Sequence, residues 1–124
     1  MAEIKVKAIV PIIALQDQRE KEGHLVTIAQ GGCAVATSAT ADVRGLILDG
    51  NDAGLHSDIA ILGTYGGTAH MKLSGPATRG QKLMLQADGT VKGAATGLAV
   101  GIALQDGAAG ELIEAAPINP TTIA

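Results

Sequence analysis

The stretch Gly45-Leu-Ile-Leu-Asp-Gly-Asn-Asp-Ala-Gly-Leu-His-Ser-Asp-Ile-Ala-Ile-Leu-Gly63 decides the fold class. Two apolar runs flank a cluster of turn-forming residues: Asp49, Gly50, Asn51, Asp52 and Gly54. Aspartate and asparagine side chains bond nearby backbone amides, and glycine adopts conformations closed to other residues, so such clusters reverse the chain. The pattern predicts a β-hairpin.

The same pattern recurs on both sides of this stretch. A β-favouring run at residues 24–29 leads into a glycine-rich and alanine-rich segment, a run at 82–87 meets the turn Asp88-Gly89, and the run at 98–104 returns at 111–116. Short strands with turns about every 8–12 residues predict an all-β fold, a small β-sandwich or β-tulip-like barrel of antiparallel hairpins.

Three apolar runs end alike, namely Ile13-Ala-Leu-Gln-Asp17, Leu46-Ile-Leu-Asp49 and Ile102-Ala-Leu-Gln-Asp106. Each precedes a glycine by a few residues and then another apolar run. Both a true internal duplication and chance similarity among Ala/Leu/Asp-rich hairpins explain the recurrence.

The composition indicates a thin core. The chain has 124 residues, 47% of them hydrophobic, but it has no Phe or Trp, and Tyr65 is its only aromatic residue. Aromatic residues normally supply the largest buried surfaces, so a core of small aliphatic residues predicts that subunit contacts add stability. We expect one domain and an oligomer.

Charge and cysteine content exclude several classes of function. The net charge is −3 and the basic residues are scattered, which disfavours nucleic-acid binding. Cys33 is the only cysteine, so it forms no intramolecular disulfide, and we expect it to be buried. There is no apolar stretch of about 18 residues, so we expect no membrane span and synthesis in the cytosol.

The N-terminal residues predict an arm or edge strand. Residues 4–8 alternate apolar and basic side chains, and Pro11 cannot donate a hydrogen bond to a sheet. We therefore expect residues 1–15 to form an N-terminal arm or edge strand, 16–116 a single β domain, and 117–124 an extended C-terminal tail.

No motif predicts catalysis, metal binding or a cofactor. The histidines His24, His56 and His70 lie in different predicted hairpins. Ser57 lies between His56 and Asp58, but neighbours in a strand point to opposite faces and cannot form a triad. The oxygen-bearing residues Asp49, Asn51, Asp52 and Asp58 do not follow calcium-loop spacing. We expect a non-enzymatic protein without metal or cofactor.

Two residues have more specific alternatives. Tyr65 lies among glycines and is a candidate interface contact, because tyrosine is enriched in interfaces. Lys72, in Met71-Lys-Leu73, is placed like the modified lysine of biotin or lipoyl carrier domains, which is the alternative to a plain strand lysine.

The C-terminal half resembles bacteriophage capsid decoration, or cement, proteins. The resemblance rests on the order of a strand, a Gly-Gln-Lys-Leu turn at 80–83, an Ala-Asp-Gly-Thr-Val hairpin at 87–91, Val-Gly-Ile-Ala-Leu at 100–104 and Gly-Glu-Leu at 110–112. It covers about residues 41–116. It implies a small β domain on the outer capsid surface, binding the major capsid protein, as a homotrimer that stabilises the head.

On this resemblance the contact residues are expected in the N-terminal arm and one loop. The expected residues are Ile4, Val6, Ile9 and Val10 in the arm and Tyr65 in the loop. Other virion components, such as a head fibre base or tail part, and a carrier or ligand-binding domain using Lys72 are the alternatives.

Overall fold

The computed structural model describes residues 9–65 and 67–124, which form strands, turns and no helix. The first sheet contains β1 (Ile9–Ile13), β2 (Leu25–Ala29), β3 (Gly32–Val35), β4 (Val43–Asp49) and β5 (His56–Ile61). The second contains β6 (Ala69–Lys72), β7 (Lys82–Leu85), β8 (Val91–Gly93), β9 (Gly97–Ala103) and β10 (Leu112–Ile123). The predicted all-β fold is confirmed.

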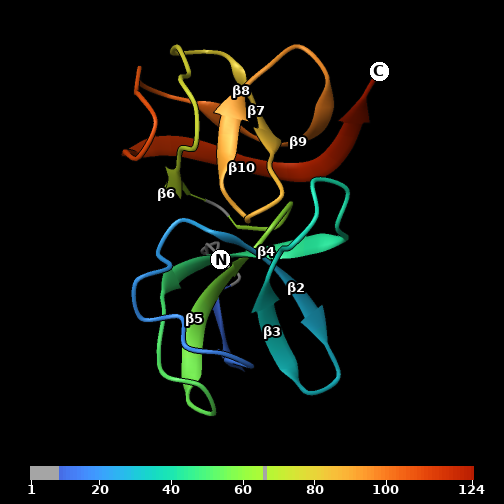
Figure 1. Cartoon of the computed structure of the whole chain (residues 1–124), viewed down its shortest axis with the longest axis vertical. Coiled ribbons are helices and arrows are strands. Elements are labelled where there is room, and N and C mark those ends of the chain that lie inside the picture. Colours follow the sequence, from blue (N-terminus) through green and yellow to red (C-terminus); the bar gives the residue numbers. More distant parts are fainter. Residues whose placement is uncertain (1–8, 66) are drawn as a thin grey trace, which may run out of the picture.

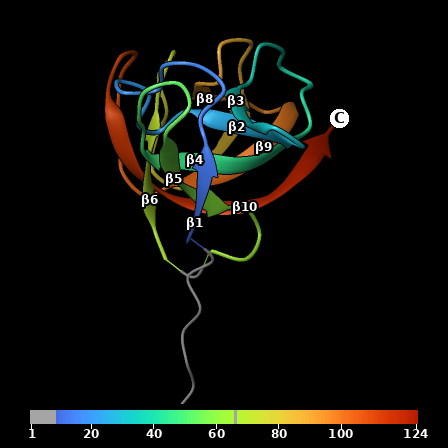
Figure 2. The same cartoon turned by 90° about the horizontal axis from the view of Figure 1, so that it is seen from below.

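Each sheet curls into a small, partly closed barrel. All pairs of neighbouring strands are antiparallel, and one parallel bridge joins the two outer strands of each sheet: Ala14 with Cys33 in the first, Leu73 with Val91 in the second. Figure 1 shows the two barrels stacked along the long axis, blue to green below and yellow to red above, and Figure 2 shows the curl from below.

The second barrel repeats the first. The strand orders are β1-β5-β4-β2-β3 and β6-β10-β9-β7-β8, so the fifth strand lies between the first and the fourth in both. The register repeats too, since Gly45 pairs with Ile61 in the first barrel and Gly101 with Pro117 in the second. A β-bulge lies at the same point of the β2–β4 and β7–β9 pairs. The tertiary structure therefore contains an internal duplication.

Hydrogen bonds outside the strands fix the equivalence residue by residue. Gly54 donates to Ala14 over 2.8 Å, and Gly110 donates to Leu73 over 2.7 Å. Both glycines have φ near +90°, a conformation that favours glycine. The similarity noted between residues 46–49 and 102–105 follows this equivalence. The run Ile13–Asp17 does not, because it corresponds to residues 72–76.

Two apolar clusters fill the molecule. The interior of the first barrel contains Val26, Cys33, Val35, Ile47 and Ile59, with Ile12 and Ile61 at its margin. The larger cluster joins the outer face of the first barrel, with Leu25 and Leu46, to the interior of the second, with Met71, Leu83 and Ile113. Tyr65 packs half-buried against this cluster.

Both ends of the described chain are paired within its own sheets. Residues 9–13 pair with β5 of the same chain, at one edge of the first sheet, and Pro11 lies within that edge strand. Residues 117–123 continue β10, whose last residues, from Thr121 to Ile123, pair with β9. The part of the expected arm before Ile9 lies outside the described residues.

Candidate interaction surface

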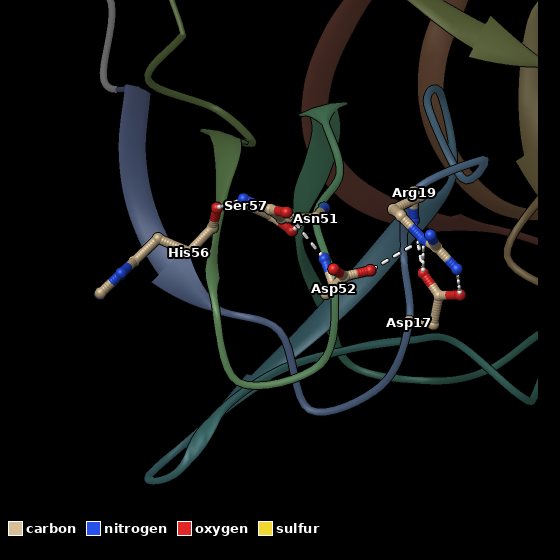
Figure 3. Close-up of polar contacts among 6 residues, drawn as sticks. All are labelled: Asp17, Arg19, Asn51, Asp52, His56 and Ser57. Atoms are coloured by element: carbon tan, nitrogen blue, oxygen red, sulfur yellow. Dashed lines mark hydrogen bonds and ion pairs between the residues drawn. The ribbon is translucent and has the colours of Figure 1, made fainter.

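A polar cluster lies on the loop after β1 and on the β4–β5 turn (Figure 3). Arg19 contacts Asp17 through Nη2 and Asp52 through Nε, both over 2.8 Å. The side-chain hydrogen bond from Arg19 holds the pKa of Asp17 at about 2, and the same contact raises the pKa of Arg19. All three side chains are more than half exposed. Exposed ion pairs contribute little stability, and no nucleophile faces this one.

The Ser57, His56 and Asp58 side chains do not converge. Ser57 is fully buried, and its Oγ donates to Gln18 Oε1 over 2.9 Å, whereas His56 and Asp58 are exposed. Figure 3 shows His56 pointing away from Ser57. The strand alternation that argued against a triad in the sequence therefore holds.

The asparagine and aspartate residues of the β4–β5 turn serve the turn itself. Asn51 Oδ1 accepts from the Asp52 N–H over 2.9 Å, and Asn51 Nδ2 donates to the His56 carbonyl over 3.3 Å. Among residues 9–65 and 67–124, no group of three His, Cys, Asp or Glu side chains is placed to hold a metal ion.

The three histidines have separate surroundings. His24 is buried, its Nδ1 lies 3.1 Å from the Lys21 carbonyl, and burial lowers its pKa. His70 lies between two carboxylates, 3.4 Å from Glu22 and 3.7 Å from Glu114. Because Glu22 belongs to the first barrel, this contact joins the two barrels.

Cys33 is fully buried in the interior of the first barrel, as expected. Burial raises the pKa of its thiol. Its Sγ lies 3.7 Å from Gln18 Oε1, an amide that cannot act as a base. A buried thiol with a raised pKa is a poor nucleophile.

Lys72 lies at the end of β6, paired opposite Leu112, and its N–H donates to the Gly23 carbonyl over 3.1 Å. It is not on an exposed hairpin tip, where carrier domains present their lysine. A pocket of about 330 Å³ opens elsewhere, between the β3–β4 loop at Ala39 and the second barrel, lined mainly by apolar atoms of residues such as Met84 and Leu98, with Lys92 as its charged residue. It lacks the converging polar groups typical of ligand sites.

Exposed large apolar side chains are concentrated on the first barrel. They are Ile9, Val10, Ile13, Leu15, Ile28 and Leu55 there, against Leu104 and Leu112 on the second. Leu15 and Leu55 are each 50% exposed. Leu15 lies over Gly31 and Gly32 at the tip of the β2–β3 hairpin, and Leu55 precedes β5.

The duplication provides an internal control for this surface. The N–H groups of Leu15 and Ser74 donate to the equivalent residues Cys33 and Val91, so Leu15 corresponds to Ser74. By the same comparison, Leu55 corresponds to Glu111. The Leu55 carbonyl accepts the N–H of Ala14 and the Glu111 carbonyl accepts the N–H of Leu73, and each donor directly follows the first strand of its barrel. The backbone therefore accepts polar residues at both positions, and apolar exposure on the first barrel is not required by the fold.

The predicted contact residues are only partly described. Ile9 and Val10 lie in β1 and are 45% and 39% exposed, and Tyr65 is half-buried. Ile4 and Val6 lie outside the described residues. Sequence reasoning missed Leu15 and Leu55. A leucine inside the turn cluster, between Gly54 and His56, was the available signal, because turns seldom need one.

No protein-family model and no curated protein sequence matches this chain. Among solved structures, the chain is similar to the N base of the head fiber gp8.5 in bacteriophage phi29. The TM-score is 0.65 at 16% sequence identity, over 94% of this chain and 97% of that one. At this identity the likeness shows a shared fold. No helix in the described residues is long and apolar enough to cross a membrane.

Proposed function

We propose that this protein is a non-enzymatic structural component of a bacteriophage virion, located on the outer surface of the head. The observation that carries the proposal is the end-to-end fold likeness to a phage head fiber base, which covers nearly all of both chains. The resemblance of residues 41–116 to capsid decoration proteins points to the same setting independently.

Within that setting, we propose that the chain decorates and stabilises the head by binding the major capsid protein as a homotrimer. Binding energy then comes from apolar contact, repeated across copies that are linked to one another. The exposed leucines of the first barrel, Leu15 and Leu55, supply a contact that the fold itself does not use.

Cosedimentation with capsids of the phage tests this proposal. The test variant is Leu15→Ser with Leu55→Gln, which follows the polar residues of the second barrel and avoids placing a glutamate beside Asp52. Because each leucine is 50% exposed, docking buries about half of its surface and contributes about 0.8–1.5 kcal/mol, so we expect the variant to bind at least about tenfold more weakly. The matched control is Leu112→His, which removes an exposed leucine from the second barrel and should bind normally.

Two results would contradict the proposal. If the wild-type protein stays in the supernatant at every concentration, the chain does not decorate that capsid. If the double variant binds as well as the wild type, the docking surface lies elsewhere. A head fibre base, the second candidate favoured by the fold likeness, would occupy a few sites rather than the whole lattice in electron micrographs.

A further inference from the structure

One side of β1 has no partner strand. Ala14 donates to Leu55 before β5, whereas Leu15 donates to Cys33 on the opposite side. Because backbone groups alternate sides along a strand, Ile9, Pro11 and Ile13 direct theirs away from β5. Within residues 9–65 and 67–124, no strand pairs with this outward side of Ile9 and Pro11, whereas the carbonyl of Ile13 lies against Gly32, beside the parallel bridge between Ala14 and Cys33. The missing N–H of Pro11 also faces outward, where a proline is tolerated.

This edge is apolar and unprotected. Ile9, Val10 and Ile13 are each at least 39% exposed, and a groove of about 240 Å³ runs between β1 and the tip of the β2–β3 hairpin. Natural edge strands usually carry charges or are covered, because a bare edge is a template for pairing.

The equivalent edge in the second barrel is protected. There, β6 carries His70, which contacts Glu22, and Lys72, whose N–H is bonded to Gly23 of the first barrel. Lys72 corresponds to Ile13, since each pairs with the first residue of its barrel's fifth strand. The equivalent strand edge therefore carries charged side chains and is covered in the second barrel, whereas in the first barrel it carries apolar side chains and is open at Ile9 and Pro11.

The charge beside the open edge is negative. Asp58 lies opposite Pro11, and Asp49 lies opposite Asp58 on the next strand. Both are exposed, and no ion pair neutralises either one within the part of the chain that the structure describes. Like charges opposite each other destabilise a sheet, so an occupant of this edge that carries positive charge is favoured.

The residues before Ile9 have the matching chemistry. The sequence Ile4-Lys-Val-Lys-Ala8 alternates apolar and basic residues, as a strand with an apolar face and a basic face does. It holds no Gly, Pro, Asn or Asp with which to turn back on β1 of its own chain. Eight residues reach up to about 28 Å when extended, far enough to meet another copy.

We propose that the open edge of β1, at Ile9 and Pro11, receives residues 4–8 of a second copy as an added strand, with Lys5 or Lys7 reaching across Pro11 toward Asp58. This inference rests on the proposed self-association of the chain, and it names the site that accepts the arm. Main-chain bonds then give affinity, and the lysine and aspartate charges set the register.

Isotope-mixed crosslinking tests the inference in the absence of capsids. Full-length ¹⁴N and ¹⁵N protein are unfolded together, refolded and treated with a zero-length carbodiimide, which joins amines to carboxylates. We expect peptides that link Lys5 or Lys7 of one isotope to Asp58 of the other, together with an oligomer by light scattering. Links within one isotope only, or a monomer with no such links, would overturn the proposal.

Variants separate edge pairing from other contacts. Ile13→Lys installs the residue found at the equivalent edge, and its charge repels the two lysines, so we expect at least a tenfold weaker association constant. Asp58→Asn should weaken it about two- to fivefold at low salt. Asp42→Asn, at an exposed aspartate paired with Arg44, is the control and should leave it unchanged. Unaltered association of Ile13→Lys contradicts the inference, while capsid cosedimentation reports the proposed function separately.

Discussion

The buried polar network of the first barrel gives the sharpest test of the structure. Gln18 is fully buried, its Nε2 donates to the Cys33 carbonyl over 3.1 Å, and its Oε1 accepts from Ser57. In Gln18→Ala the Ser57 hydroxyl loses its acceptor inside a low-dielectric interior, while the Cys33 carbonyl keeps its bond from the Leu15 N–H. The orphaned hydroxyl costs about 1–3 kcal/mol, and the lost side chain leaves a cavity that adds to this cost. We expect about 2–4 kcal/mol of destabilisation, a large part of the roughly 5–15 kcal/mol typical of a domain.

The second barrel shows how the same site is filled without polar groups. Gln18 and Ala77 occupy equivalent positions, because their N–H groups donate to the carbonyls of the corresponding turn residues Asn51 and Gly107. Ala77 is buried there, together with Ile113 and Val91, which correspond to Ser57 and Cys33. The triple variant Gln18→Ala, Ser57→Ile, Cys33→Val removes the Gln18 amide and the Ser57 hydroxyl together. The Asn51 N–H, which donates to Ser57 Oγ over 3.0 Å, can then turn to the carbonyl of residue 18, as the Gly107 N–H donates to Ala77 in the second barrel. The triple variant should therefore recover most of the loss caused by Gln18→Ala alone, since replacing both partners of a bond is far less costly than orphaning one.

Urea unfolding followed by far-UV circular dichroism measures these differences, provided that the m-values agree. Gln16→Ala is the control, because Gln16 is exposed and accepts one bond of 3.3 Å from the Val35 N–H. A loss below about 1 kcal/mol for Gln18→Ala, or a triple variant less stable than the single one, would refute the reasoning.

Three further predictions follow from named contacts. Gly23→Ala should destabilise by about 1–2 kcal/mol or more, because φ is +83° and a Cβ would lie 2.8 Å from Lys72 N in the other barrel. Gly54→Ala, at φ +88° with open space around it, carries the backbone strain without the clash. The difference between the two variants in thermal unfolding therefore measures the steric contribution. Burial lowers the pKa of His24 in the folded protein, so the unfolded chain binds the proton more readily. Stability should therefore fall as the pH drops from about 7.5 through 6.5 and below. His24→Gln should flatten this pH dependence in urea titrations, and an equal slope in both proteins would refute the prediction. The buried Cys33 thiol should react with an aromatic disulfide reagent only as fast as the first barrel opens to expose it. The absorbance of the released aromatic thiol measures this rate, and immediate reaction would contradict the burial of Cys33.

Local sequence alone determined the hairpins. The turn residues between Asp49 and Gly54, the Asp88-Gly89 pair and the glycine-rich turn before Glu111 reverse the chain where the structure does. These signals are local, because a side chain that bonds its own turn, or a glycine with positive φ, needs no distant partner. The same holds for the all-β class and for the exposure of His56 and Asp58 on either side of Ser57.

Only the tertiary structure decided the barrels, the duplication and the exposed edge. Pairing β1 with β5 joins residues from 9–13 to 56–60, and such non-local choices depend on the competition among all strands rather than on local preference. The two barrels share a backbone but fill it differently, with Gln18 and Ser57 in one and Ala77 and Ile113 in the other. Packing constrains volume and satisfied bonds rather than residue identity. For that physical reason the register shows the whole repeat, whereas the sequence shows it only at residues 46–49 and 102–105.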